Sequence, residues 1–329
     1  MKLTNWSLRS WLRKYLDIKP VSIPAEPRAD SGAKQSWAST IAISEPGAPF
    51  QPVGPVAQHV QSDPWISFDD TILPRPIADY VALDGWPLPA TAEREGYHGQ
   101  RHYDYWLSGL RDYLKIKQVT HRWGVALEPG SRVLELGCAS GRVLRHFAAQ
   151  DPGIELWGTD INLRHVEWML TYLDPRLKVF QNTVLPHLPI PDNHLNLIYA
   201  MSVFTHIDTF ELTWLAELHR CLRPGGMAYI TMHTEHTWQI MHPQTALYRD
   251  LLAVKDFVSD YDITPDFLAS PMPKPKTIIK WQIGSVNNSS VFVSSDHIRT
   301  VWGRFFRIEE IIREGSDYQD VIVLRKADA

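Results

Sequence analysis

Cysteine is scarce in this chain, which has only Cys138 and Cys221 in 329 residues. Neither belongs to a paired-ligand motif, so the spacing gives no sign of a zinc site. Two isolated cysteines favour a reducing cytoplasm over a disulfide framework. The sequence therefore predicts a fold without disulfide staples and without a bound metal.

Long apolar runs and an excess of positive charge are also missing. No run approaches the ~20 apolar residues that span a membrane, and the N-terminus lacks the uninterrupted apolar core of a secretory signal. The formal net charge is −4, whereas a nucleic-acid-binding surface normally shows a basic excess. We therefore expect a soluble, intracellular protein whose ligand is not a nucleic acid.

The most informative segment that is present runs from a hydrophobic strand into a glycine-spaced turn and then a helix, over residues 133–149. Gly137 and Gly141 let the backbone approach a ligand where a Cβ would collide, and the helix N-terminus faces the same spot. A dinucleotide fingerprint would need glycine where Ala139 and Arg142 stand. The segment therefore predicts a cofactor-binding corner, but not one for a dinucleotide.

The Glu-x-Gly-x-x-x-Gly pattern from Glu135 to Gly141 resembles the first motif of the class I S-adenosylmethionine-dependent methyltransferases. Further matches follow in that family's order: a strand and acid at 155–160, a strand at 177–182, a Leu-Pro turn and strand at 188–202, and a Pro-Gly-Gly turn and strand at 218–230. The resemblance implies an α/β, Rossmann-like, seven-stranded sheet, mostly parallel with an antiparallel last strand. It also implies S-adenosyl-L-methionine as the cofactor.

The same resemblance implies which residues bind that cofactor. Asp160 ends the second strand about 20 residues after the glycine loop, where a carboxylate can accept both ribose hydroxyls. Asn182 ends the third strand, near the expected place of the adenine. The full predicted set is Glu135, Gly137, Cys138, Gly141, Asp160, Ile161, Asn182 and Met201.

Two histidines are candidates for catalysis. His206 follows the fourth strand and precedes a helix with a capping-box-like start at residues 208–211, so the helix dipole would favour a neutral imidazole. The alternative is that His206 only hydrogen-bonds its loop. His233, at the end of the fifth strand, is the second candidate. His233 and His236 lack a third ligand at recognisable spacing, so we predict no metal there.

The chain before the predicted catalytic domain changes composition. Residues 1–19 predict a basic amphipathic helix, which either contacts an anionic membrane or partner or packs on its own domain. Residues 20–63 are rich in proline and alanine and read as a disordered linker. Residues 64–118 are expected to form an N-terminal extension that closes the substrate pocket, with Tyr103 as a lid residue. The alternative for Tyr103 is the buried face of a helix.

Residues 119–329 form the predicted methyltransferase domain, interrupted by an insertion at 238–291 that we expect to select the substrate. Gln319 precedes the last strand and is expected either to reach the pocket or to end a loop. The segments at 158–162, 202–206 and 318–320 resemble a bacterial methyltransferase subgroup associated with glycan or secondary-metabolite biosynthesis.

From this resemblance we expect methyl transfer, to oxygen in particular, on a small-molecule or glycan-linked acceptor. The protein would be cytoplasmic, or peripheral at the inner membrane face if residues 1–19 bind there. A non-catalytic cofactor-binding scaffold that docks a partner or membrane through its N-terminal helix stays open as the alternative.

Overall fold

The computed structural model describes residues 41–44, 47–68, 72–254, 257–258, 260–281 and 289–328. The helix predicted for residues 1–19 and the first half of the predicted linker lie outside these described residues. Hydropathy within the described part leaves no helix long and apolar enough to cross a membrane.

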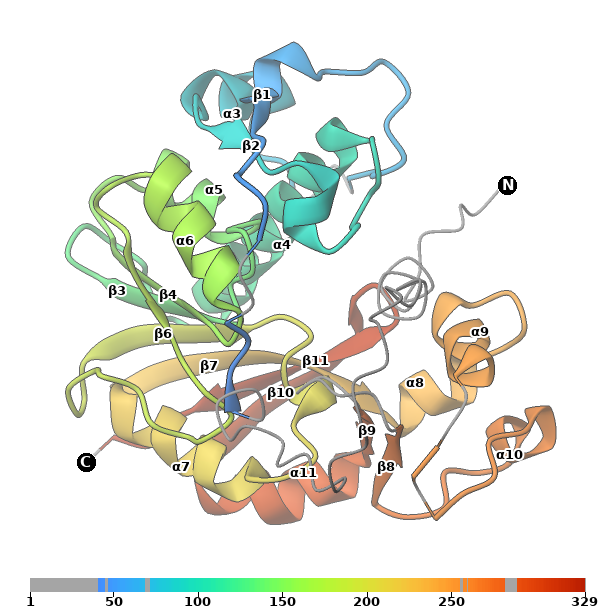
Figure 1. Cartoon of the computed structure of the whole chain (residues 1–329). Coiled ribbons are helices and arrows are strands. Elements are labelled where there is room, and N and C mark those ends of the chain that lie inside the picture. Colours follow the sequence, from blue (N-terminus) through green and yellow to red (C-terminus); the bar gives the residue numbers. More distant parts are fainter. Residues whose placement is uncertain are drawn as a thin grey trace, which may run out of the picture.

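A twisted sheet forms the centre of the molecule (Figure 1). Its main strands are β3 (Arg132–Leu136), β4 (Glu155–Asp160), β5 (Lys178–Gln181), β6 (Leu195–Ala200), β7 (Leu222–Thr234), β10 (Arg307–Ser316) and β11 (Gln319–Arg325). They lie in the order β10-β11-β7-β6-β3-β4-β5. Neighbours from β7 to β5 pair in parallel, while β11 runs antiparallel to β7 and β10. The predicted α/β sheet with an antiparallel last strand is confirmed.

Two strands from the C-terminal half extend this sheet beyond the seven predicted. β9 (Ser289–Val293) pairs in parallel with the end of β7, where His233 lies opposite Phe292, and β8 (Lys276–Lys280) pairs antiparallel with β9. The described residues therefore form a sheet of nine strands. Through this pairing, the C-terminal part of the predicted insertion is hydrogen-bonded to the last residues of β7.

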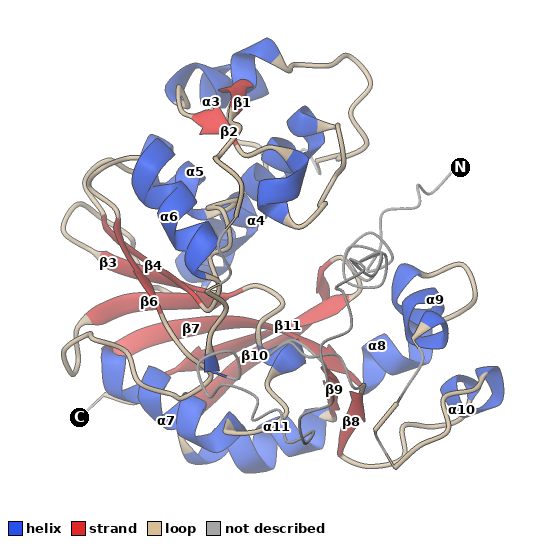
Figure 2. Ribbon diagram, in the orientation of Figure 1, coloured by secondary structure: helices blue, strands red, loops and turns tan. Residues whose placement is uncertain are grey.

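Helices cover both faces of the sheet (Figure 2). One layer holds α4 (His102–Arg122), α5 (Leu144–Gln150) and α6 (Leu163–Tyr172), and the other holds α7 (Glu211–Cys221) and α11 (Ser295–Val301) with the short η4 (Trp302–Arg304). Every residue of β6 is buried, and Tyr199 packs in the core of the first layer while Ile198 packs in that of the second. This follows from the two-residue period of a strand covered on both sides.

The N-terminal extension begins earlier than residue 64. It contains β1 (Val53–Pro55), η1 (Val56–Gln58), α3 (Ile77–Leu83), β2 (Pro87–Leu88) and η2 (Thr91–Arg94). β1 pairs with β2, and the Val56 side chain is fully buried. The expectation of a disordered linker up to residue 63 is therefore corrected for residues 47–63. Prolines in this stretch occupy the short strand β1, at Pro55, and irregular segments, at Pro49 and Pro52, where a missing N–H costs little.

The boundary predicted at residue 118 falls inside α4, which continues to Arg122. This helix packs closely on the start of α5, because a Cβ at Gly109 would overlap the backbone carbonyl of Arg142. The His146 imidazole also donates from Nε2 to the Trp106 carbonyl at 3.0 Å. The extension and the catalytic domain thus share one helix and one core.

The insertion forms a small helical unit with its own apolar cluster. It contains α8 (Glu235–Ile240), α9 (Ala246–Ala253) and α10 (Pro265–Ala269). Trp238 and Leu251 pack in that cluster with Phe292 of β9. Figure 1 shows these helices beside the ends of β8 and β9, so the insertion borders the sheet edge described next.

Candidate active site at the carboxyl ends of the strands

The glycine loop joins β3 to α5 and depends on left-handed backbone conformations. Gly137 and Gly141 have φ of +74° and +78°, and Ala139 between them has φ of +45°. A Cβ at Gly137 would also overlap Val203, and one at Gly141 would press on Leu173. The glycines are therefore required by backbone conformation and close internal packing, in addition to the ligand approach that the sequence suggested.

Asp160, at the end of β4, lies directly against this loop. Its Oδ2 accepts a hydrogen bond from the Ala139 amide and its Oδ1 accepts one from the Asn162 amide, both at 2.8 Å. Burial alone would raise the pKa of Asp160, but His165 and these two amides outweigh it and lower that pKa. The carboxylate is thus ionised at neutral pH, and each oxygen keeps lone-pair capacity for further donors.

His165 supports that charge from α6. Its Nδ1 lies 3.4 Å from Asp160 Oδ1, and its Nε2 lies 3.6 Å from Glu95 Oε1. Burial would lower the pKa of His165, but the neighbouring carboxylates, led by Asp160, raise it. The end of β4 therefore carries a fixed carboxylate beside a histidine whose protonated form that carboxylate favours.

Glu135 has the opposite character. Its side chain is buried in β3, and Oε2 accepts a hydrogen bond from the Tyr199 hydroxyl at 3.0 Å. Burial raises the pKa of Glu135 to about 8. The hydrogen bond from Tyr199 and the charge of Arg142 lower that pKa, but by less than burial raises it. A buried carboxyl that lacks a full counter-charge is suited to a cationic ligand, and the S-adenosylmethionine that the sequence resemblance implies carries a sulfonium and an ammonium group.

The remaining predicted cofactor residues fall into two groups. The Cys138 side chain is buried under the loop, and its amide donates to the Thr159 carbonyl at 3.0 Å, so its thiol faces the core. Ile161, Asn182 and Met201 lie at the strand ends and are only partly buried. Asn182 Oδ1 accepts from the Thr159 hydroxyl at 3.1 Å, which fixes the amide beside the end of β4.

A second polar group lies where β7 ends and the antiparallel β11 begins. Gln319 Nε2 donates to Ser202 Oγ at 2.9 Å and approaches His233 Nε2 at 3.4 Å. The His233 ring lies between Phe292 and Tyr318, with ring centroids 5.0 and 5.7 Å away. Burial lowers the pKa of His233 to about 3, so the ring is neutral, and its Nδ1 is buried without a hydrogen-bond partner.

His206 belongs to the short helix η3 (Phe204–His206) after β6. Its Nδ1 lies 2.7 Å from the Ser289 carbonyl, so Nδ1 donates the hydrogen and Nε2 carries the lone pair. Burial lowers the pKa of His206, and His206 in turn lowers the pKa of His233. The structure therefore brings the two predicted histidines into one electrostatic neighbourhood.

The capping box predicted after His206 is wrong. Helix α7 begins at Glu211, and its N-cap is Phe210 in a left-handed conformation with no side-chain cap. Asp208 instead pairs with Lys280 at 2.5 Å, and Glu211 pairs with Lys276 at 2.7 Å. Both acids face the inserted strand β8, whose position the local sequence does not reveal. The neutral state of His206 follows from burial, which lowers its pKa and outweighs the opposite effect of the Ser289 carbonyl.

Sequence reasoning missed the contribution of η2 to this site. The Ser140 hydroxyl in the glycine loop donates to the Glu93 carbonyl, and the Glu93 carboxylate pairs with Arg164 of α6. Glu95 faces His165. These contacts join residues 47 to 71 positions apart, so no local motif signals them.

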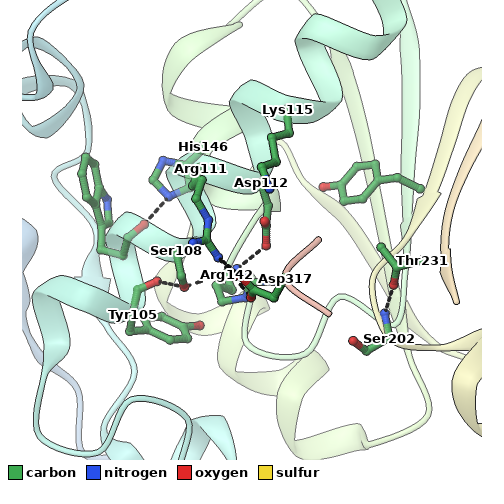
Figure 3. Close-up of polar contacts among 12 residues, drawn as sticks. Tyr105, Ser108, Arg111, Asp112, Lys115, Arg142, His146, Ser202, Thr231 and Asp317 are labelled. Atoms are coloured by element: carbon green, nitrogen blue, oxygen red, sulfur yellow. Dashed lines mark hydrogen bonds and ion pairs between the residues drawn. The ribbon is translucent and has the colours of Figure 1, made fainter. Parts of the chain in front are cut away.

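Helix α4 lines the other side of the glycine loop (Figure 3). Arg142, directly after Gly141, pairs with Asp112 at 2.7 Å and donates to Ser108 Oγ at 3.3 Å. Arg111 pairs with Asp317 in the β10–β11 turn at 2.9 Å. Tyr103 is only 5% exposed and stacks on Trp106, which favours the packing alternative over a lid role.

A metal site finds no support in the residues that the structure describes, where no three His, Cys, Asp or Glu side chains are grouped to hold an ion. His236, the partner of His233 in the sequence motif, points to Glu314 at 3.1 Å instead.

A glycine loop at the switch in strand order, an ionised acid at the end of the next strand, and an antiparallel β11 together define a class I S-adenosylmethionine-dependent methyltransferase. Residues 107–290, more than half of the chain, match the family described as a methyltransferase domain. The chain belongs to this family, and its residues fit S-adenosylmethionine as the cofactor.

Shorter similarities link the chain to fungal enzymes. It is 30% identical over 108 residues to sterol 24-C-methyltransferase ERG6B of Gibberella zeae, a match covering 31% of this chain and 28% of the relative. It is 31% identical over 114 residues to sterol 24-C-methyltransferase erg6 of Schizosaccharomyces pombe, covering 33% and 29%. The matched segments span less than a third of these curated relatives.

Solved structures also resemble the chain. A putative sarcosine dimethylglycine methyltransferase from Galdieria sulphuraria superposes with a TM-score of 0.45 at 14% identity, covering 67% of this chain and 86% of that one. A methyltransferase from Methanosarcina mazei superposes with a TM-score of 0.42 at 16% identity, covering 64% and 98%.

Proposed function

We propose that this protein transfers the methyl group of S-adenosylmethionine to a hydroxyl of a small-molecule or glycan-linked acceptor. The observation that carries the proposal is the ionised Asp160 against the glycine loop, with spare lone pairs for the two ribose hydroxyls. The cofactor supplies, when bound, a methyl group on a positively charged sulfur. The Glu135 carboxyl beneath the loop also supports binding of a cation. Burial disfavours its ionised form, and a bound cation would offset that cost by pairing with the carboxylate.

His206 is the proposed general base. The Ser289 carbonyl holds the Nδ1 hydrogen, which leaves Nε2 free to accept a proton from the acceptor hydroxyl. Burial keeps the ring neutral at the pH of the cell, so no proton must be removed before the reaction. Fixing the ring also reduces the entropy lost on reaching reactive geometry.

His233 and Gln319 are proposed to contact the acceptor from the end of β7 and the start of β11. The unpartnered Nδ1 of His233 supports this role, because a buried polar atom without a partner costs free energy that an acceptor oxygen would recover. The aromatic rings of Phe292 and Tyr318 beside it would suit an acceptor with an apolar face.

Methyl transfer to carbon is the second candidate. It is supported by the two sterol 24-C-methyltransferase relatives, which share about 30% identity with part of this chain. A carbon acceptor would also need a base to remove a proton, so His206 serves both candidates. The non-catalytic scaffold remains the alternative in which the cofactor binds without turnover.

A labelled-methyl experiment separates the three candidates. The purified protein is incubated with methyl-labelled S-adenosylmethionine and two acceptor panels, one of sugars and phenols and one of sterols with a side-chain double bond. Label recovered as a base-stable methyl ether supports transfer to oxygen, and label on a new carbon–carbon bond supports the second candidate. Tight binding of S-adenosylhomocysteine without transfer to either panel supports the scaffold.

A further inference from the structure

We propose that the N-terminal extension contains a binding site for a small oxyanion, such as phosphate, built around the buried guanidinium of Arg94. Arg94 is 1% exposed at the end of η2. Its Nη2 donates to the Gly99 carbonyl and to His102 Nδ1, but Nε and Nη1 have no hydrogen-bond partner. No acidic side chain in the described part of the chain forms an ion pair with it.

A second buried arginine in the same layer shows what a completed site looks like. Arg145 is also fully buried, and it donates from Nε and Nη2 to the two oxygens of Asp84 at 2.7 and 2.8 Å. It also donates to the carbonyls of Trp86 and Pro87. Arg145 thus carries its own counter-charge, and Arg94 lacks one. A buried charge without a partner is costly enough that structures normally supply one.

The side chains around Arg94 can donate to an anion but do not supply one. The rings of His59 and His102 lie 4.9 Å apart, and His59 Nε2 is buried without a partner. The Tyr105 ring stacks on the guanidinium, with Cζ 4.6 Å from its centroid. Burial, and then the Arg94 charge, lower the pKa of His102 to about 4, so the cluster carries one net positive charge from Arg94.

Three free N–H groups of a guanidinium and a neighbouring imidazole suit an oxyanion. Arginine hydrogen-bonds carboxylate and phosphate groups more strongly than neutral acceptors, and its weak hydration favours such pairs in buried places. An oxyanion beside His59 would also favour protonation of Nε2, which would then donate a further bond. The ligand class is therefore a compact oxyanion, and inorganic phosphate is the simplest probe.

The position of this cluster would link anion binding to the cofactor loop. Arg94 directly follows Glu93, whose carbonyl accepts from Ser140 and whose carboxylate pairs with Arg164. An anion that fixes η2 would therefore stabilise those contacts as well. The cluster itself is built from η1, η2 and the start of α4, before residue 107 where the family match begins.

Thermal unfolding of the full chain tests the proposal. Inorganic phosphate is titrated at constant ionic strength, with sodium chloride as the balancing salt. The melting temperature of the wild type should rise saturably, and Arg94→Met should weaken the apparent phosphate affinity by about 10- to 100-fold. Arg75→Met is the matched control, since Arg75 also stacks on a tyrosine of the extension but lies outside the cluster. An equal phosphate effect in wild type and Arg94→Met overturns the proposal, because it would be a general salt effect.

Two further measurements keep the test independent of folding of the variant and of the cofactor site. In the wild type, the imidazole proton resonances of His59 and His102 should shift saturably with phosphate, and unchanged resonances would overturn the site. The phosphate titration is then repeated with saturating S-adenosylhomocysteine. Phosphate affinity that persists supports a separate site. Competition between the two would instead assign Arg94 to the carboxylate of the cofactor and overturn a separate oxyanion site.

Discussion

The candidate site has two halves that are held together by different kinds of contact: a cofactor half around Asp160 and an acceptor half around His206 and His233. At the ends of β3 and β4, both oxygens of Asp160 accept amides from residues within 21 positions of it, and His165 stands five positions away. At the ends of β6 and β7 and the start of β11, the polar contacts join Ser202 to Gln319 and His206 to Ser289, 117 and 83 positions apart. The contacts of Asp160 on the cofactor side thus lie within one stretch of chain, to which η2 adds distant contacts through Glu93, whereas the polar contacts on the acceptor side all join distant segments.

This difference also appears in the state of the polar groups. The Asp160 carboxylate has its charge balanced before any ligand arrives, whereas His233 keeps a buried Nδ1 without a partner. A preorganised half suits the cofactor, which is the same in every catalytic cycle, because preorganisation reduces the cost of binding. A half with an unpaired polar group suits an acceptor that supplies the missing hydrogen bond.

His206→Asn should have the largest effect and should act only on the acceptor half. We expect turnover to fall by about 10²- to 10⁴-fold while cofactor affinity stays nearly unchanged, because Asn cannot accept a proton at neutral pH. Because burial lowers the pKa of His206, the wild-type rate should rise with pH below the ordinary histidine value, and the variant should lose that limb. Steady-state kinetics across pH measure both. His219→Asn, at the far end of α7, is the control. Turnover within a few-fold of wild type would reduce His206 to a loop residue.

Asp160→Ala should damage the cofactor half alone. Loss of two charge-assisted hydrogen bonds to the ribose should weaken S-adenosylhomocysteine binding by roughly 2 to 4 kcal/mol. Calorimetry measures this, with Asp174→Ala as the control because Asp174 pairs only with Arg176 and Arg176 is largely exposed. Wild-type affinity in the Asp160 variant would contradict the ribose assignment.

Gly109→Ala should disrupt the close packing between α4 and the end of the glycine loop. The added Cβ would overlap the Arg142 carbonyl, so we expect a loss of about 1 to 3 kcal/mol of stability, partly offset by the better helix propensity of alanine. Denaturant unfolding measures it. Gly85→Ala is the matched control, because a Cβ there meets no atom within 4 Å. Equal stability of the two variants would show that α4 does not pack tightly against the backbone at Arg142.

Glu135→Gln should change how stability depends on pH. In the cofactor-free protein the pKa of Glu135 is raised from 4.5 to about 8, so between these values the native state holds a proton that the unfolded chain releases. Its contribution to stability is therefore complete below about pH 4.5 and is lost as pH rises towards 8, with a slope approaching ~1.4 kcal/mol per pH unit. The variant should lack this decline. Parallel unfolding curves for both proteins at several pH values would contradict the buried, protonated carboxyl.

The main strands, the glycine loop and Asp160 could be predicted from the sequence because each lies in a short segment that resembles a motif of the family. The spacing from Gly141 to Asp160 is likewise a property of one contiguous segment. The predicted strand at 155–160 matches β4 to the residue. The linker prediction failed for residues 47–63 because composition does not reveal a pairing such as that of β1 with β2, 35 positions away at Val53 and Leu88.

The sequence alone was sufficient to predict the class of the fold and the loop expected to bind the cofactor, because each family motif lies within a short stretch of chain. Four properties required the tertiary structure: the tautomer of His206, the protonation of Glu135, the absence of a counter-charge at Arg94 within the described residues, and the added strands β8 and β9. These properties depend on burial and on which distant groups meet, and neither quantity is a function of local residue order.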